Sequence, residues 1–281
     1  MSELNALNYF TPEMNMKYVS VSQYKQFMGN PFSNDVCEAA ALAEAKGEIV
    51  RPITKSLLMG QYVDEALTGD LEAFKLEHPE LFVTKGSRVG ELKADYIQAE
   101  KMVERATSDP TFMDFMKGGE FQVIMTGNIE NVPVKIKIDH VAYLKGKPVA
   151  LVDLKTVRSM HETFRAKDSG EYMTWVERWN YDLQGAVYQE IYYQNTGLKL
   201  PFYIAAISKD KSDDTPHPRL KIIQIPQMKL DERLAEVKSN IWKIDALKKG
   251  EIQPIHCKHC DYCADNLPCE VISLDELLLE V

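Results

Sequence analysis

The chain has 281 residues, of which 45% are hydrophobic and 27% charged, and its formal net charge is −9. This composition is typical of a globular protein and excludes collagen-like, disordered and coiled-coil chains. The negative charge argues against a protein that coats nucleic acid indiscriminately, but a local basic groove is compatible with it because screening limits each charge's reach to about 10 Å. The sequence has no secretory signal and no apolar run near the ~20 residues of a membrane-spanning helix. We therefore expect a cytoplasmic protein without a membrane partner.

Helical signals dominate the N-terminal part of the chain. Ser20 or Ser22 is a typical N-cap residue, and Gly47 is a typical helix end. Apolar residues recur at helical spacing between these signals and beyond them. The expected helices are 18–28, 37–47, 56–67 and 90–116, the last as one long helix or a pair.

The pattern changes to that of strands at residue 121. Residues 121–157 are rich in β-branched side chains, with turn signals at Gly127–Asn128 and Gly146–Pro148. Apolar residues alternate with lysines from 134 to 138, which predicts a strand with one buried and one solvated face that ends at Asp139.

The rest of the chain alternates between strands and helices. The segment 149–154 is apolar on both faces and is expected to be a central strand. A helix over 171–195, strands at 202–208 and 221–226, and a helix over 229–249 are expected to follow. This order predicts an α/β fold, in which helices flank a mixed β-sheet and the N-terminal part is helical.

Two aspartates and a lysine form the first candidate site. Asp153 and Lys155 share one face of their strand because side chains alternate, and a hairpin places Asp139 beside Asp153. Two such carboxylates can hold Mg²⁺ or Mn²⁺ and position a water nucleophile. The lysine can orient or help deprotonate this water, or neutralise charge on a phosphate. The alternative is a turn aspartate and an edge ion pair, but an ionised pair in an apolar central strand is costly to bury.

The spacing of these residues resembles the signature of PD-(D/E)XK nucleases. It consists of Ile138-Asp139, 13 intervening residues, and Asp153-Leu154-Lys155. Gln184 and Tyr188 are four residues apart on one helix face and resemble the QxxxY motif of the RecB-type branch. The resemblance implies that these two residues support the site or the DNA.

Two further acidic residues match this branch less closely. Asp64 lies four residues after Gly60, where the branch has a histidine, and aspartate is also an acceptable ligand for a hard metal ion. Glu120 precedes the first strand and matches an additional acidic residue of these nucleases, with a solvated helix-end glutamate as the alternative. The resemblance therefore implies a metal site formed by Asp64, Glu120, Asp139 and Asp153.

Over its whole length the chain resembles the phage RecE-like exonucleases. The similar segments extend from the first predicted helix to the terminal cysteines. The resemblance implies a restriction-endonuclease-like core and Mg²⁺-dependent, 5′ to 3′ hydrolysis of double-stranded DNA from its ends, in phage-type recombination. It also implies a single-strand annealing protein as partner, a homo-oligomeric ring, and the cytosol of a bacterium or phage-infected host.

Four of the five cysteines lie between residues 257 and 269. The spacing C-x-x-C-x-x-C lets several thiolates face one metal or cluster. One hypothesis is a local structural zinc, with His256 or His259 as an added ligand. The other follows from a resemblance to iron–sulfur nucleases related to RecB, in which an N-terminal cysteine joins three C-terminal ones around a 4Fe–4S cluster. The favoured ligands are Cys37, Cys257, Cys260 and Cys263, with Cys269 able to replace one of them.

We expect a single nuclease domain over 1–281. Its parts are a mainly helical segment (1–118), the nuclease core (119–250) and a cysteine-rich segment (251–281). Two alternatives are an iron–sulfur nuclease that prefers single strands, as in CRISPR adaptation, and an inactive nuclease fold that binds DNA ends or an annealing protein. Candidate phosphate contacts near the site are Arg158, Arg165 and Lys167.

Overall fold

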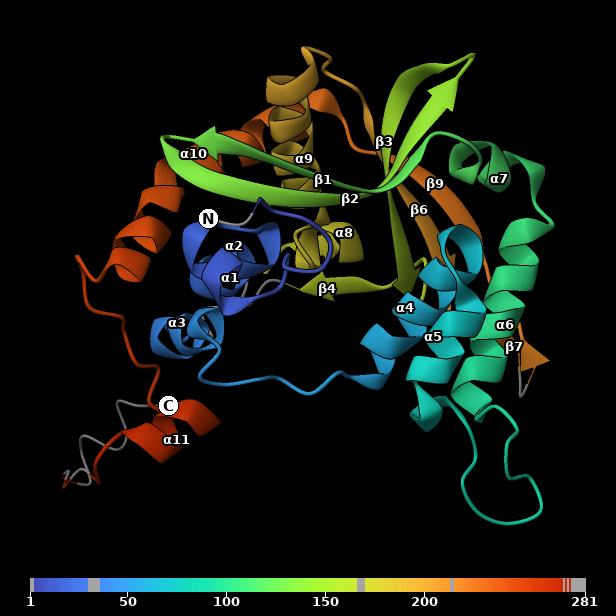
Figure 1. The fold of residues 1–281 in the computed structure, drawn as a ribbon, viewed down its shortest axis with the longest axis horizontal. Coiled ribbons are helices and arrows are strands. Elements are labelled where there is room, and N and C mark those ends of the chain that lie inside the picture. Colours follow the sequence, from blue (N-terminus) through green and yellow to red (C-terminus); the bar gives the residue numbers. More distant parts are fainter. Residues whose placement is uncertain are drawn as a thin grey trace.

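A computed structural model describes residues 3–29, 36–165, 170–212, 215–269, 271 and 273. A curved sheet occupies the centre of the molecule, and helices lie on both of its faces (Figure 1). The helices are α1 (Pro12–Lys17), α2 (Val21–Met28), α3 (Glu38–Lys46), α4 (Lys55–Thr68), α5 (Leu71–Glu77), the 3₁₀ turn η1 (Pro79–Leu81), α6 (Ala94–Thr107), α7 (Pro110–Met116), α8 (Trp175–Arg178), α9 (Tyr181–Thr196), α10 (Gln227–Lys249) and α11 (Asp261–Asn266). The strands are β1 (Glu120–Ile129), β2 (Val132–Leu144), β3 (Lys147–Val157), β4 (Thr163–Arg165), β5 (Tyr172–Thr174), β6 (Phe202–Ser208), β7 (Lys211–Ser212), β8 (Thr215–Pro216) and β9 (Leu220–Gln224).

The main sheet has five strands in the order β1-β2-β3-β6-β9. The first three strands form an antiparallel meander, β6 runs parallel to β3, and β9 runs antiparallel to β6. Helix α9 lies in the crossover between the parallel strands β3 and β6, as parallel pairing requires. The α/β class with a mixed sheet flanked by helices is therefore confirmed.

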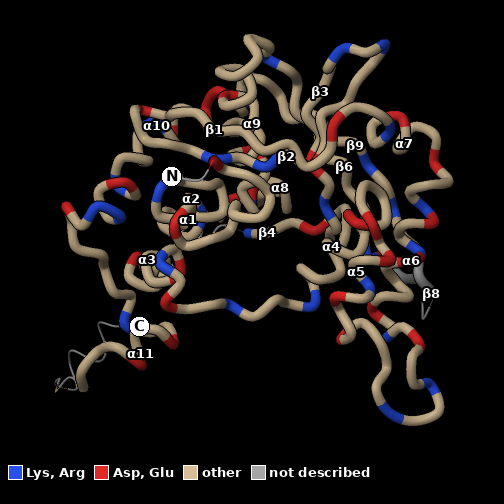
Figure 2. The backbone as a smooth tube through the Cα atoms, in the orientation of Figure 1, with Lys and Arg blue, Asp and Glu red and all other residues tan. Residues whose placement is uncertain are grey.

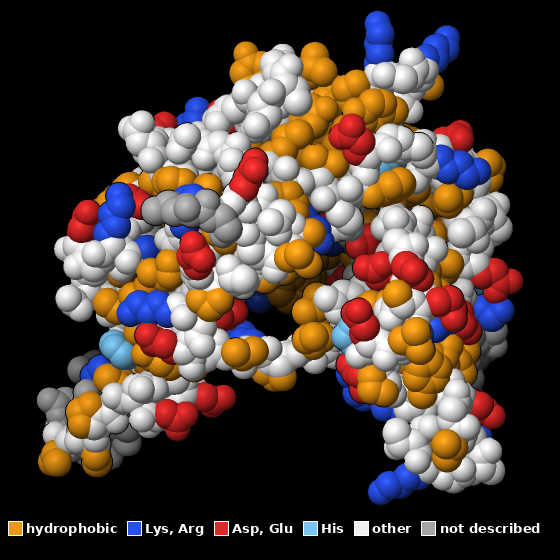
Figure 3. All heavy atoms as spheres, viewed as in Figure 1, with side chains coloured by type: hydrophobic (Ala, Val, Ile, Leu, Met, Phe, Trp, Pro, Cys, Tyr) orange, Lys and Arg blue, Asp and Glu red, His pale blue; other side chains and the backbone are white. Residues whose placement is uncertain are grey.

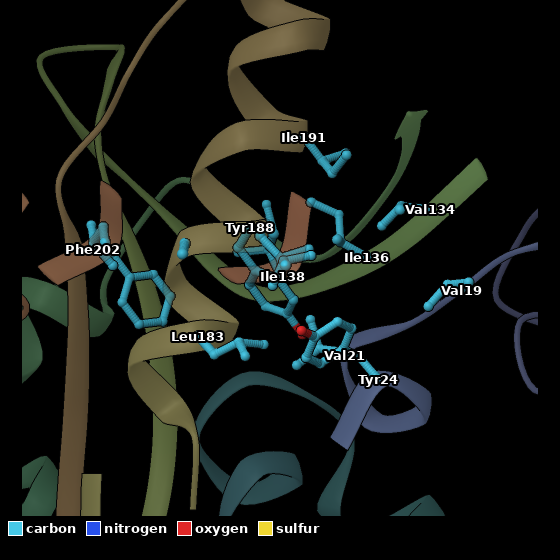
Figure 4. Packing of buried hydrophobic residues seen from close by; sticks show 14 of the residues in the cluster. Val19, Val21, Tyr24, Val134, Ile136, Ile138, Leu183, Tyr188, Ile191 and Phe202 are labelled. Carbon is cyan, nitrogen blue, oxygen red and sulfur yellow. The ribbon is translucent and has the colours of Figure 1, made fainter. Parts of the chain in front are cut away.

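The sheet separates two apolar cores. On one face, Ile136 and Ile138 of β2 pack against Tyr188 and Ile191 of α9, with α2 closing the cluster (Figure 4). On the other face, side chains of α4, α6 and α7 pack against β3 and β6, with Val152 among them. Burial of each large apolar side chain contributes roughly 1.5–3 kcal/mol, so both faces of the sheet are held firmly.

The first predicted turn is misplaced by about three residues. Gly127 and Asn128 lie inside β1, and the chain turns at Glu130 and Asn131, whose φ angles are 47° and 64°. Two such residues form the two-residue turn that suits the twist of a hairpin. Gly127 instead lies under α9, where a Cβ would press on the ends of the Gln194 and Ile191 side chains.

One face of β2 is less solvated than the alternating pattern predicts. Lys135 is only 1% exposed, because the N-terminal segment covers it. Its ammonium donates to the Tyr9 carbonyl and, at 2.8 Å, to the Asn15 side chain. The prediction of a solvated lysine is therefore wrong, since a segment distant in sequence supplies the hydrogen bonds that a buried ammonium needs.

Two other local predictions need correction. Asp139 lies within β2 rather than at its end, because the strand continues to Leu144. The region 171–195 is not one helix, since β5 and α8 precede α9 and Asn180, at φ 53°, separates the two helices. The region 90–116, expected as one long helix or a pair, forms the pair α6 and α7. Within the described residues, no helix has the length and apolar character required to span a membrane.

Candidate active site

The two predicted aspartates meet where β2 and β3 begin to separate. His140 pairs with Val152 across the two strands, and Asp139 and Asp153 come next along them. There the Asp139 carboxylate accepts a hydrogen bond from the Leu154 backbone N–H at 3.0 Å. At this point a side-chain hydrogen bond joins the two strands in place of a backbone one. The strands are therefore further apart, and both carboxylates can contact Lys155.

Lys155 lies between the two carboxylates. Its Nζ is 2.5 Å from Asp153 Oδ2 and 3.9 Å from Asp139 Oδ2. Burial disfavours its charge, but Asp153 and Asp139 outweigh burial and raise the pKa of Lys155 above its usual value. Burial, and then the charge of Asp153, raise the pKa of Asp139 well above its ordinary value. Lys155 is therefore protonated, and the site still lacks positive charge.

Gln184 connects helix α9 to this group. Its Nε2 donates to Asp153 Oδ1 at 2.7 Å, and both side chains are buried. Tyr188, one turn further along α9, lies in the apolar core with its ring edge-on to Phe202 (Figure 4). Gln184 contacts Asp153 directly, and the charges of Asp153 and Asp139, after burial, raise the pKa of Tyr188, so both residues of the predicted pair lie beside the acidic group.

Asp64 reaches the same site from α4. Burial raises the pKa of its carboxyl group, and its charge in turn contributes to the raised pKa of Asp139. Gln122 donates to Asp64 Oδ2 at 3.0 Å and was not identified from the sequence. Phe121 and Val123 pair with His140 and Ile138, so Gln122 bulges out opposite Asp139 with φ 52°. Bulges redirect side chains in this way next to functional sites.

Glu120 does not join the acidic group. It pairs with Val141 and accepts a hydrogen bond from the Tyr143 hydroxyl at 3.1 Å. The exposed Arg158 pairs with Glu162 at 3.4 Å, and Arg165 donates to the Gly170 carbonyl. Lys167 lies outside the described residues. Among the described residues, the carboxylates near Asp139 do not gather as three ligands within 4.8 Å of one another, so any hard ion there would complete its shell with water.

The acidic residues open into a cleft between the two halves of the molecule. A cavity of ≈ 410 Å³ is lined by Ser56, Gly60, Asp64, Asp139, Lys155, Tyr181 and Lys209, among others. Figure 3 shows this hollow, with acidic side chains gathered on its α4–α6 side and an extended segment crossing below it. Figure 2 shows that charges of both signs occur along the chain, so the net charge does not describe this site.

Four cysteines meet at the two ends of the fold. The Sγ of Cys37, at the start of α3, is 3.5 Å from that of Cys263, and Cys257 Sγ is 3.9 Å from Cys263 Sγ. With Cys260 they form a group whose sulfur atoms all lie within 4.8 Å of one another. The predicted approach of Cys37 to the C-terminal cysteines is thus present, and Cys269 is exposed and outside the group.

The thiols of this group differ in acidity. Burial and neighbouring thiols raise the pKa of Cys263 to about 12. Burial also opposes ionisation of Cys257, but hydrogen bonds from the backbone of His259 and from Cys260 lower its pKa to about 6. Cys257 is therefore the thiol that most readily supplies a thiolate to a metal ion.

The C-terminal segment docks on α3 through more than the cysteines. The Ile255 N–H donates to Glu38 at 3.0 Å, and the Ala39 N–H donates to the Ile255 carbonyl at 3.2 Å. Lys243 of α10 pairs with the same glutamate at 2.5 Å. The thiols are thus presented on a preformed backbone.

Comparison with known proteins agrees with this architecture. The model of a family described as a PDDEXK-like domain of unknown function (DUF3799) matches residues 20–266. The crystal structure of a protein from Eubacterium rectale named a putative exonuclease is 40% identical, covers 99% of this chain and 98% of its own, and gives a TM-score of 0.87. The structure of SSO0001 is 15% identical over 82% of this chain and 92% of its own, and it gives a TM-score of only 0.28. A search of curated proteins found no match.

Proposed function

Because this chain belongs to the family of PDDEXK-like domains that matches residues 20–266, we propose that it is a nuclease that hydrolyses double-stranded DNA from its ends. The observation that carries the proposal is the contact of Lys155 with both Asp139 and Asp153 in an open cleft. The Eubacterium rectale protein is similar to this chain over almost the full length of both. Its name, a putative exonuclease, supports exonuclease activity.

Asp139 and Asp153 would hold Mg²⁺ or Mn²⁺. The raised pKa of Asp139 supports this, since a cation would relieve the repulsion between the two neighbouring carboxylates. Mg²⁺ binds through one or two carboxylates and retains several waters, so two aspartates suffice and Asp64 can anchor one of these waters. The ion would supply Lewis-acid activation of water and phosphate.

The protein side chains would perform three tasks. Gln184 fixes one oxygen of Asp153, so that the other contacts Lys155. The protonated Lys155 donates to the attacking water or to a phosphate oxygen, and it stabilises charge that develops there. The two carboxylates beside it favour the charged form of Lys155, and this form fits the role of hydrogen-bond donor and charge stabiliser.

The resemblance to RecE-like exonucleases adds finer proposals. They are 5′ to 3′ polarity, a role in phage-type recombination, a single-strand annealing protein as partner, and a ring-shaped oligomer. Digestion of linear duplex with a label on one strand end tests the enzymatic proposals, with Mg²⁺ added and Asp153→Asn as the inactive control. We expect immediate release of a 5′ label and stepwise shortening of the 3′-labelled strand of linear DNA, and no hydrolysis of closed circles. Equal degradation of circles, or no hydrolysis by the wild-type chain, would contradict end-dependent nuclease activity.

The cysteine group would hold one tetrahedral metal ion. Four thiolates around zinc at about 2.3 Å stand about 3.8 Å apart, and the described Sγ separations of 3.5 and 3.9 Å match this spacing. In a 4Fe–4S cluster each thiolate binds a different iron, so the sulfurs stand further apart. We therefore favour zinc. The sequence had instead favoured a 4Fe–4S cluster. Metal analysis of purified protein, with sulfide assay, tests this choice.

A further inference from the structure

Strand β9 forms one edge of the main sheet (Figure 1). The Ile225 N–H donates to β6 and the Arg219 carbonyl accepts from it, so every second residue between them also faces β6. The backbone N–H and C=O groups of Leu220, Ile222 and Gln224 therefore point outward. Among the described residues, no group pairs with them. Such an edge can accept a further strand.

A groove lies beneath this edge. Its cavity of ≈ 720 Å³ is larger than the ≈ 410 Å³ of the catalytic cleft. Lys221, Ile223 and Ile225 of β9 line it, together with the segment 160–163, the apolar side chain of Trp175 on α8, and the start of α10. Directly opposite side chains of paired strands share a face. A strand added to β9 would therefore place every second side chain in this groove.

Two charges at the groove have no partner of opposite sign among the described residues. They are Lys221, near the start of β9, and Glu232, on the helix that follows the end of β9, and both are exposed. The other carboxylates of the lining are paired with a cation at 3.4–3.9 Å: Glu162 with Arg158, and Glu177 and Asp182 with Lys229. A ligand with the opposite order of charges would complement the free pair.

We propose that β9 and this groove bind an extended segment of another protein as an added antiparallel strand. In this direction, which is the slightly more stable one, the C-terminal end of the segment lies at Lys221. The segment has an acidic residue opposite Lys221, apolar residues opposite Ile223 and Ile225, and a basic residue before them, toward Glu232. Main-chain hydrogen bonds supply affinity, and the groove selects the side chains. The inference goes beyond the proposed nuclease function and does not depend on it.

A labelled peptide with uncharged termini and the sequence Lys-Thr-Ile-Thr-Ile-Thr-Glu tests this proposal, with fluorescence anisotropy as the measurement and the full chain as the receptor. We expect saturable binding. The peptide with exchanged charges, Glu-Thr-Ile-Thr-Ile-Thr-Lys, should bind at least about threefold more weakly, because it places like charges together at both ends. Equal or tighter binding of the exchanged peptide, or no saturation below about 1 mM, would overturn the proposal.

Methylation of peptide nitrogens tests the strand pairing without any change in the protein. In the proposed register the last two threonines lie opposite Gln224 and Ile222 and pair with their backbone groups, whereas the isoleucine N–H groups point to solvent. N-methylation of these threonines should weaken binding by at least about tenfold, because two hydrogen bonds are lost. N-methylation of the two isoleucines is the control and should have little effect. Equal effects would exclude an added strand.

Gln224 provides a matched pair of protein variants. Gln224→Pro removes one outward N–H and retains the bonds to β6, because an edge strand tolerates proline where its nitrogen faces solvent. Gln224→Ala removes the same exposed side chain and keeps the N–H. The proline variant should bind the peptide about fivefold more weakly, and the alanine variant should bind as the wild type does. Equal affinities of the two variants, with thermal unfolding like that of the wild type, would contradict the proposal.

Lys221→Glu tests the register. This variant should prefer Lys-Thr-Ile-Thr-Ile-Thr-Lys over the original peptide, whereas the wild type should have the opposite preference. An unchanged order of preference would show that the register is wrong.

A peptide with the sequence of residues 270–281 tests a second copy of this chain as the alternative occupant. It contains four acidic residues and no basic one, so it lacks the charge that Glu232 requires and should not compete. Displacement of the labelled peptide by this sequence, as effective as by the unlabelled original, would assign the edge to another copy of the chain and overturn the proposal.

Discussion

Gln184 on α9 and Asp153 on β3 are joined by a buried hydrogen bond of 2.7 Å between Nε2 and Oδ1. This bond ties the crossover helix of the parallel unit to the acidic strand, and it leaves Asp153 Oδ2 facing Lys155. Asp153 Oδ1 is buried, so removal of the Gln184 amide would leave it without a hydrogen-bond donor. Both the stability of the protein and the orientation of the carboxylate would then change.

The first prediction is that Gln184→Leu lowers DNA hydrolysis by about 10–100-fold and weakens Mg²⁺ binding, as losses of groups that orient metal ligands do. It should also destabilise the protein by roughly 1–3 kcal/mol, because a buried carboxylate oxygen loses its donor. Hydrolysis rates, Mg²⁺ titration and denaturant unfolding measure these effects. Gln194→Leu, which removes hydrogen bonds between α9 and Asn128 away from the acidic group, is the control for hydrolysis and Mg²⁺ binding, and equal effects of both variants on these two measurements would contradict a specific role.

Asp139→Asn should stabilise the protein in the absence of divalent ions. Burial and Asp153 raise the pKa of Asp139, so the folded state favours the protonated form, and folding stability falls as the pH rises from the ordinary carboxyl pKa to that raised pKa. The asparagine removes this penalty and can still accept from the Leu154 N–H. The gain in Tm over wild type should therefore be larger at pH 8 than at pH 5.

Asp231 provides a control for this measurement, because its pKa is shifted in the opposite direction to that of Asp139. Hydrogen bonds from Gln227 and then Lys199 lower the pKa of the exposed Asp231. Asp231→Asn should therefore leave stability unchanged or reduce it slightly above the ordinary carboxyl pKa. Addition of Mg²⁺ should raise the Tm of the wild type and of Asp231→Asn, but not of Asp139→Asn. A Tm for Asp139→Asn that is below wild type at pH 8 would refute the repulsion argument.

Lys155→Met should separate turnover from metal binding. The ammonium stands 2.5 Å from Asp153, where it competes with a metal ion for the carboxylate. Its removal should preserve or tighten Mg²⁺ affinity but lower hydrolysis at saturating Mg²⁺ by at least about 100-fold, as does the loss of a group that stabilises developing charge. Loss of Mg²⁺ binding with an unchanged rate would show that the lysine holds the metal site together instead.

The spacing of local elements predicted the centre of this site. Asp139, Asp153 and Lys155 lie on neighbouring strands of a hairpin, and the alternation of side chains determines which of them share a face. Gln122 could not be found in this way, because a bulge with positive φ brings it to Asp64 and ordinary alternation does not. Lys135 was misjudged since its partners, Tyr9 and Asn15, are more than a hundred positions away in sequence. Contacts between distant segments decide such cases.

The final prediction concerns the thiol group that joins the two ends of the fold. Cys37 and Cys263 are 226 positions apart, yet their Sγ atoms are 3.5 Å from each other. A metal ion held by Cys37 and the three C-terminal cysteines restrains most of the chain, which stabilises the folded state and keeps Arg51, close by in sequence, beside the cysteine group. We expect one zinc per chain in the wild type.

Cys37→Ser should lose this zinc and lower the Tm by several degrees, whereas Cys269→Ser should retain both, since Cys269 lies outside the group. A chelator should destabilise the wild type and Cys269→Ser but have little effect on Cys37→Ser, which is the result that distinguishes loss of a metal from loss of a packed thiol. Iron and acid-labile sulfide in protein purified without oxygen would establish a cluster in place of zinc. Zinc content that is unchanged in Cys37→Ser would show that the C-terminal cysteines bind the ion alone, and the join between the chain ends would then rest on the hydrogen bonds of Glu38 and Ile255.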